Sequence, residues 1–174
     1  LSLDGKRFFY ENMLRRAKEL DYKLIWPLTR SEYILSYCCP PNLARTIAQS
    51  SEYAYLTSDN SVWTGMYGAS EAQVKLENGG EFTLVQSTDD GTIRFTAKDV
   101  KINAPVHLRL RVPGWSAGGS IKGAGADREL TKEDAGTYLD ILVEDPQNMD
   151  VQLSLDMKVR YTVANNMVEE TVGQ

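Results

Sequence analysis

Residues 106–112 read VHLRLRV, and apolar and polar side chains alternate along this stretch without exception. Successive side chains of a β-strand point to opposite faces, so the alternation divides the stretch into two sets. The apolar set consists of Val106, Leu108, Leu110 and Val112. The polar set consists of His107, Arg109 and Arg111. The stretch therefore predicts a strand with one buried face and one solvent-facing face.

The same period of two returns in other segments of the second half of the chain. These segments are TIRFTA (92–97), DVQLSLDM (150–157) and KVRYTV (158–163). Residues typical of turns separate them: Asn78-Gly79-Gly80, Asp89-Asp90-Gly91, Pro113-Gly114 and Asp145-Pro146. Short alternating strands without a helical pattern between them favour an antiparallel β-sandwich, in which two sheets pack through their apolar faces.

The first third of the chain has a different period. In NLARTIAQSSEYAYL (42–56) apolar residues return with a spacing near 3.6, which is typical of an amphipathic helix. Asn42 is a candidate N-cap, and the two prolines before it suit an extended segment leading into the helix. We therefore expect a mainly β protein with a helical N-terminal part, divided into residues 1–58 and a β-sandwich over residues 59–174.

The composition excludes some classes of function. The chain has 174 residues, 42% of them hydrophobic and 25% charged, which suits a packed globular core. The net charge is −5, so the chain lacks the basic character typical of a nucleic-acid-binding protein. No apolar run is long enough for a membrane span. We expect neither nucleic acid nor membrane as a partner. The chain opens on Leu1, which suits a piece of a longer protein, and its compartment stays undetermined.

The two cysteines of the chain, Cys38 and Cys39, are neighbours. A disulfide between adjacent residues is strained and closes no long loop, so a structural cross-link is disfavoured. Two ordinary buried thiols are one alternative. The other is thiolate chemistry, because a helix N-terminus favours an anion and lowers the pKa of a nearby thiol. Two thiolates can also bind zinc, although zinc needs further ligands that no nearby motif supplies.

The stretch around these cysteines, YCCPPNLARTIAQ (37–49), resembles the Cys-Cys-Pro-Pro-Asn signature of the glycoside hydrolase family typified by β-L-arabinofuranosidases. The resemblance extends over essentially the whole chain. It includes LSLDGKRFFYENML (1–14), HLRLRVPGW (107–115) and VANNMVEETVGQ (163–174). Met13 departs from the family pattern, where a proline is usual.

The resemblance implies a fold and a mechanism. The family has an (α/α)₆ barrel followed by β-sandwich domains, so residues 1–58 would be the last piece of the barrel. Its members are retaining exo-glycosidases that use a cysteine nucleophile and a zinc ion bound by three cysteines and a glutamate. Carried over by position, Cys38 matches the nucleophile and one zinc ligand, Cys39 matches a second zinc ligand, and Tyr10 matches a sugar-contacting tyrosine.

The other zinc ligands and the acid/base residue would lie outside this chain. We therefore expect carbohydrate substrates, arabinofuranosides or related glycans, and zinc in the full-length parent. In this chain alone we expect neither zinc nor activity. The competing hypothesis is a stand-alone carbohydrate-binding or structural β-sandwich, whose ligand aromatics would lie on a sheet face or rim. On the residues alone, His107 is predicted to be a surface residue and Trp63 a core residue.

Overall fold

The computed structural model describes residues 4, 6, 38–161, 163, 165 and 167. The chain divides into two compact units, Leu1–Ser51 and Glu52–Gln174, which are described separately. Most of the first unit, including the predicted substrate contact Tyr10, lies outside the described residues. The expected origin of residues 1–58 as the end of a helical barrel therefore stays a prediction.

The described part of the first unit contains helix α1, Cys39–Ala48. The helix begins three residues before the predicted N-cap Asn42, and its N-cap is Cys38. Pro40 and Pro41 therefore lie in the first helical turn rather than in an extended segment before it. A proline is tolerated there because the first N–H groups of a helix have no intrahelical partner. The helix also ends earlier than its apolar spacing suggested.

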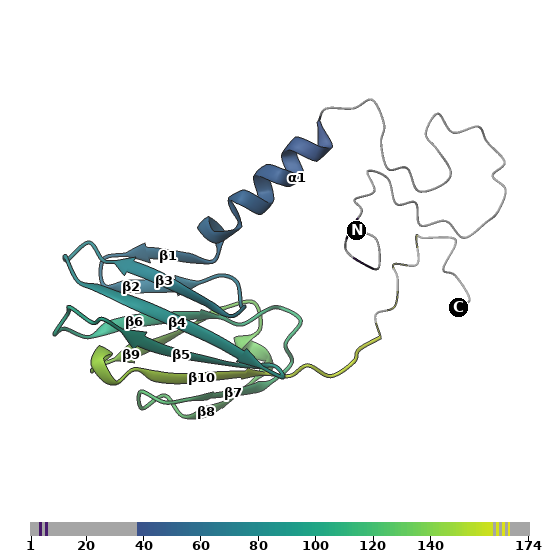
Figure 1. Ribbon diagram of the computed structural model, residues 1–174. Helices are drawn as coiled ribbons and strands as arrows, with labels where there is room; N and C mark the ends of the chain where they lie inside the picture. Colours follow the sequence, from purple (N-terminus) through teal and green to yellow (C-terminus); the bar gives the residue numbers. More distant parts are fainter. Residues whose placement is uncertain are drawn as a thin grey trace, which may run out of the picture. The chain divides into compact units, whose positions relative to one another are not determined.

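The second unit is a β-sandwich whose strands follow one another with short connections (Figure 1). The strands are β1 (Tyr55–Ser58), β2 (Ser61–Thr64), β3 (Ser70–Lys75), β4 (Glu81–Asp89), β5 (Thr92–Lys98), β6 (Val106–Arg111), β7 (Gly119–Lys122), β8 (Arg128–Leu130), β9 (Tyr138–Val143) and β10 (Asp150–Leu155). Three 3₁₀ turns accompany them in the described residues: η1 (Ser50–Tyr53), η2 (Lys132–Asp134) and η3 (Pro146–Asn148).

Two sheets form the layers of the sandwich. Sheet I has the strand order β1-β2-β6-β9, and sheet II has the order β3-β4-β5-β10-β7-β8. The predicted mainly β, antiparallel sandwich is confirmed, with one exception: β2 and β6 pair in parallel. The chain leaves sheet I after β2 and returns with β6, which explains how these two strands can share a direction. Strand β1, placed by sequence in the helical part, pairs with β2.

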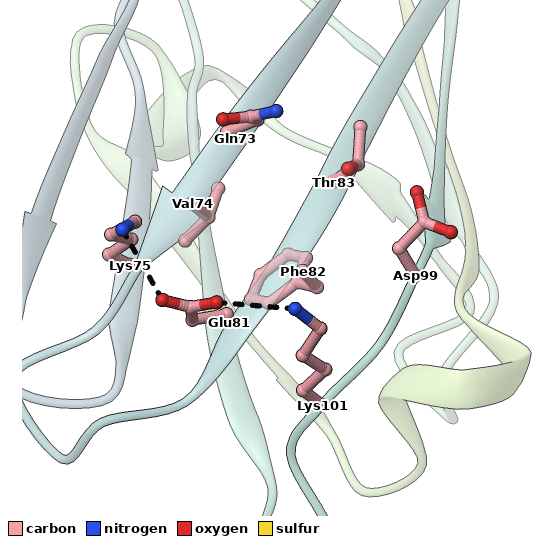
Figure 2. Close-up of a pocket in the computed structure, with 8 residues that line it drawn as sticks. All are labelled: Gln73, Val74, Lys75, Glu81, Phe82, Thr83, Asp99 and Lys101. Carbon is pink, nitrogen blue, oxygen red and sulfur yellow. Dashed lines mark ion pairs between the residues drawn. The ribbon is translucent and has the colours of Figure 1, made fainter.

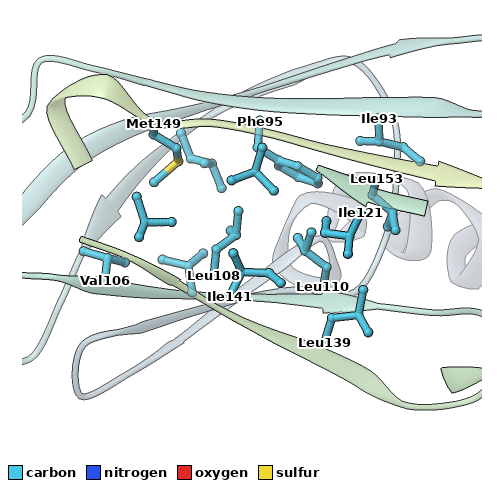
Figure 3. Close-up of a cluster of buried hydrophobic side chains, with 14 of the residues drawn as sticks. Ile93, Phe95, Val106, Leu108, Leu110, Ile121, Leu139, Ile141, Met149 and Leu153 are labelled. Atoms are coloured by element: carbon cyan, nitrogen blue, oxygen red, sulfur yellow. The ribbon is translucent and has the colours of Figure 1, made fainter. Parts of the chain in front are cut away.

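The core lies between the inner faces of the two sheets (Figure 3). Strand β6 occupies the middle of sheet I, and its apolar set is buried as predicted. The exposures of Val106, Leu108, Leu110 and Val112 are 0–1%. From sheet II, Phe95, Val151 and Leu153 contribute side chains with 0% exposure. The alternating pattern therefore identified the inner face correctly in both layers.

Local turn chemistry agrees with the sequence at the β4–β5 connection. The strands end at Asp89 and resume at Thr92, so Asp90 and Gly91 form a two-residue turn with φ of 39° and 79°. Positive φ at both positions is typical of the turn that matches the twist of a hairpin.

The strand predicted over residues 158–163 is wrong. Residues 158–161 form no strand, and Val159, Tyr161 and Val163 are 86–97% exposed. Alternation alone does not make a strand, because a strand also needs a partner edge. The preceding strand β10 is already paired on both sides, with β5 and β7.

Candidate functional site

The two cysteines lie at the start of α1. Cys38 is its N-cap and Cys39 its first residue. The thiol of Cys38 is exposed and is not part of a disulfide. The positive end of the helix dipole favours a negative charge at this position, although Pro40 and Pro41 supply no N–H group to the first turn. The structure thus places Cys38 where a thiolate is stabilised, one turn closer to the helix than the sequence suggested.

No group of three or more His, Cys, Asp and Glu side chains suitable for a metal ion occurs among the described residues. Cys38 and Cys39 would supply two sulfur ligands to a zinc ion, and soft sulfur donors suit that metal. In the part that the structure describes, no helix is long and apolar enough to cross a membrane.

A surface pocket of ≈ 410 Å³ lies on sheet II (Figure 2). Its charged side chains largely neutralise one another, because Glu81 bridges Lys75 at 3.4 Å and Lys101 at 3.6 Å. The hydrogen bond from Lys75, with the charges of both lysines, lowers the pKa of Glu81. The described residues that line the pocket include no thiol, and their one aromatic side chain, Phe82, is buried. The Glu81 carboxylate is engaged by both lysines, so this pocket is the weaker candidate site.

The outer face of sheet I is a second candidate, built around the polar side of β6. The β-sheet register aligns Leu56, Trp63, Arg109 and Asp140 across the strands β1, β2, β6 and β9. Asp140 lies 2.7 Å from Nδ1 of His107 and 3.3 Å from the Arg109 guanidinium. The Arg109 guanidinium carbon also lies 4.4 Å from the centroid of the Trp63 ring.

Aromatic contacts fix the other side of this cluster. The Trp63 and Tyr138 rings meet edge to face with centroids 5.0 Å apart. Nε1 of Trp63 donates a hydrogen bond of 3.1 Å to Oγ of Ser58. The sequence missed this group, because Trp63 was assigned to the core. In β2 the side chains of Val62 and Thr64 are fully buried, and Trp63 points to the opposite face. The residue types of SVWT do not alternate between apolar and polar, so the sequence carries no clear signal for that placement.

Comparison with known proteins gives the family. Residues 61–157 match the family described as beta-L-arabinofuranosidase, GH127 middle domain. The non-reducing end beta-L-arabinofuranosidase of Bifidobacterium longum subsp. longum is 30% identical over 193 residues, which cover 100% of this chain and 27% of that enzyme.

Solved structures that resemble this chain belong to the same class of enzymes. A glycoside hydrolase superposes with a TM-score of 0.81 and 35% identity over 98% of this chain and 28% of its own. The GH127 beta-L-arabinofuranosidase of Geobacillus stearothermophilus T6 gives a TM-score of 0.75 and 30% identity over 95% of this chain and 27% of its own. The chain spans about a quarter of the length of these relatives.

The sandwich and these matches define the class of protein as glycoside hydrolase. Within that class, the chain belongs to the GH127 β-L-arabinofuranosidase family, and residues 61–157 correspond to its middle domain. The resemblance found in the sequence is thereby confirmed.

Proposed function

We propose that this chain is part of a retaining exo-glycosidase that removes β-L-arabinofuranosyl residues from glycans, and that Cys38 is its nucleophile. The observation that carries the proposal is the match over the full chain to a non-reducing end beta-L-arabinofuranosidase. The exposed thiol of Cys38 at the N-terminus of α1 supports the role given to that residue.

In the proposed reaction Sγ of Cys38 attacks the anomeric carbon as the bond to the leaving oxygen breaks. The leaving oxygen takes a proton from a general acid outside this chain, and a covalent glycosyl-cysteine remains. Water, deprotonated by the same acid/base group, then attacks the anomeric carbon. The carbon–sulfur bond breaks, and Cys38 returns as a thiolate. Two displacements at one carbon retain its configuration.

Cys38 and Cys39 would hold zinc in the full-length parent, together with ligands from outside this chain. When bound, zinc keeps a coordinating thiol ionised at neutral pH and so makes sulfur a competent leaving group in the second step. The N-terminus of α1 favours the same ionised form through the positive end of the helix dipole. Tyr10 is proposed to contact the sugar.

The proposal is tested in the full-length parent by turnover of an aryl β-L-arabinofuranoside. Cys38→Ser should lower kcat/KM at least about 10³-fold, because it removes the nucleophile. Cys39→Ser should lower both the zinc content and activity, while Ser51→Ala, an exposed residue just after α1, should change neither. Activity of Cys38→Ser within about tenfold of the wild type would contradict the role of Cys38.

The chain of 174 residues by itself should show no glycosidase activity and bind no stoichiometric zinc, because it supplies two of the proposed zinc ligands and no acid/base. Elemental analysis of the purified chain checks this expectation. One tightly bound zinc per chain would contradict the proposed ligand set.

A further inference from the structure

We propose that the outer face of sheet I is a non-catalytic oligosaccharide-binding surface. The sugar face, as it is called below, consists of Leu56, Trp63, His107, Arg109, Tyr138 and Asp140. The choice of pentose oligosaccharides as ligands rests on the proposed function, whereas the surface itself is inferred from its own geometry.

The sugar face is long enough for more than one sugar ring. Its central row crosses sheet I from Leu56 on β1 to Asp140 on β9. With neighbouring strands about 4.8 Å apart, the row spans roughly 14 Å. Its side chains project from paired strands rather than from a loop. A surface of this length suits a chain of sugars better than a single monosaccharide.

The apolar part of the sugar face can pack against the C–H surface of a sugar ring. Tyr138 is 41% exposed and Leu56 is 62% exposed. Trp63 lies between them in the sheet and is fixed by Tyr138, Arg109 and the hydrogen bond to Ser58. Trp63 therefore acts as a positioning residue that holds Tyr138 and Arg109, while Tyr138 offers the accessible ring.

The polar part of the sugar face carries donors and acceptors side by side. Asp140 accepts a hydrogen bond from His107 and forms an ion pair with Arg109, and its side chain is still 48% exposed. A carboxylate has about four acceptor sites, so Asp140 can accept from a sugar hydroxyl without losing these contacts. The Arg109 side chain, 30% exposed, supplies N–H donors beside it. A hydroxyl group both donates and accepts, which complements such a pair.

A sugar fits this surface better than a protein partner does. The ion pair between Arg109 and Asp140 occupies the β6–β9 half of the row, and the cores of protein interfaces are depleted in charged residues. A protein surface would have to desolvate that pair, which is costly unless every group finds a new partner. A sugar instead displaces water molecules and offers its own hydroxyl groups to the ion pair as hydrogen-bond partners.

The outer face of sheet II shows what a solvent-facing surface looks like in this fold. Its described outward residues include no aromatic side chain, and its charges pair with one another, as in Glu71–Lys98 and Arg94–Asp150. Among the described residues, the outer face of sheet I therefore carries exposed aromatic and apolar side chains that the outer face of sheet II lacks. Solvation explains sheet II, whereas the exposed ring and apolar side chains of the sugar face need a further explanation.

The test is an NMR titration of the 174-residue chain with a linear arabino-tetrasaccharide. Wild type should bind saturably, with shifts confined to the outer face of sheet I. Tyr138→Ala and Asp140→Asn should each weaken binding at least about tenfold, or about 1.4 kcal/mol. Tyr138→Phe, which keeps the ring, should bind within about threefold of wild type. Thr96→Ala on the outer face of sheet II should bind like wild type.

A cooperative thermal unfolding transition shows that each variant is folded. If either Tyr138→Ala or Asp140→Asn fails to fold, the other still tests the inference. Absence of saturable binding up to about 10 mM tetrasaccharide would overturn the inference, as would unchanged binding by both Tyr138→Ala and Asp140→Asn. The experiment measures binding by a chain that is expected to be inactive. Its failure would leave the proposed hydrolase activity standing, and failure of the Cys38 test would leave the sugar face standing.

Discussion

Asp134 shows how one carboxylate can stabilise a connection between strands. It accepts two hydrogen bonds from the Arg128 guanidinium, at 2.9 and 2.7 Å, and one from the backbone N–H of Thr131 at 2.8 Å. The bonds from Arg128 and then Thr131 hold the pKa of Asp134 well below its usual range. A carboxyl whose pKa is lowered on folding stabilises the fold above its unfolded pKa, near 3.9, and this contribution is lost as the pH falls.

Asp134→Asn should therefore lower the free energy of unfolding by about 1–2 kcal/mol at pH 7, because it replaces one of the two acceptor oxygens with an N–H donor and removes the charge that pairs with Arg128. The difference from wild type should shrink as the pH falls below about 4, because Asp134 of the unfolded wild-type chain is then protonated while the folded state still holds the carboxylate ionised. Urea unfolding across this pH range measures it. Glu144→Gln, a neutralised carboxylate on an exposed residue, is the control and should differ little from wild type. A difference independent of pH would contradict the assignment.

Gly119 is a residue whose identity the backbone requires. Its φ is 137°, and a Cβ added there would overlap the backbone oxygen of Ser154 on β10. Gly119→Ala should lower the free energy of unfolding by about 3 kcal/mol, since neither backbone can move without disturbing the sheet. The neighbouring Gly118 is a matched control, because its Cβ would lie 3.8 Å from the nearest atom. Equal melting temperatures for the two alanine variants would contradict this account.

At the scale of elements, strand β6 organises sheet I, since it pairs with β2 on one side and β9 on the other. Leu108 is fully buried in it, and Leu108→Ala should lower the free energy of unfolding by about 2–5 kcal/mol. Arg111→Ala, at an exposed position of the same strand, should cost about 0.5 kcal/mol or less. Denaturant unfolding of both variants checks this, and comparable losses would contradict the assignment of the two faces.

The sequence predicted strands better than boundaries, for a physical reason. The alternation in 106–112 records which side chains are buried, and burial is what the sheets impose. The start of α1 depends instead on where the backbone bends. Pro40 and Pro41 are compatible with either an extended segment or a first helical turn, so the residue types alone did not decide. The false strand at 158–163 had the alternation but no edge to pair with.

For the candidate sites, the sequence predicted the reactive cysteines but not the group of residues from several strands that forms the outer face of sheet I. Cys38 and Cys39 were identified from their type, their adjacency and the helix that follows them. Trp63 was misplaced, and Asp140 was not singled out. Their partners His107, Arg109 and Tyr138 come from other strands, and sequence spacing does not reveal which strands pair. Nonlocal pairing, rather than local propensity, decided the composition of the sugar face.

At the scale of the whole molecule, the chain is one part of a larger hydrolase architecture, about a quarter of the length of its relatives. The sandwich has its own core, whereas the thiols of Cys38 and Cys39 provide only part of the proposed catalytic machinery. A chain divided in this way should unfold cooperatively through the sandwich without any zinc dependence. Melting curves of the 174-residue chain with and without a chelator should coincide, and a chelator-dependent loss of stability would contradict this expectation.

The central claim, that Cys38 attacks the sugar, is tested most directly by mass spectrometry of the full-length parent quenched during turnover of an aryl β-L-arabinofuranoside. The account predicts that the peptide containing Cys38 gains the mass of one pentose residue, and that fragmentation places it on Cys38 rather than Cys39. An active enzyme whose pentose adduct forms on another residue, with Cys38 unmodified, would contradict it.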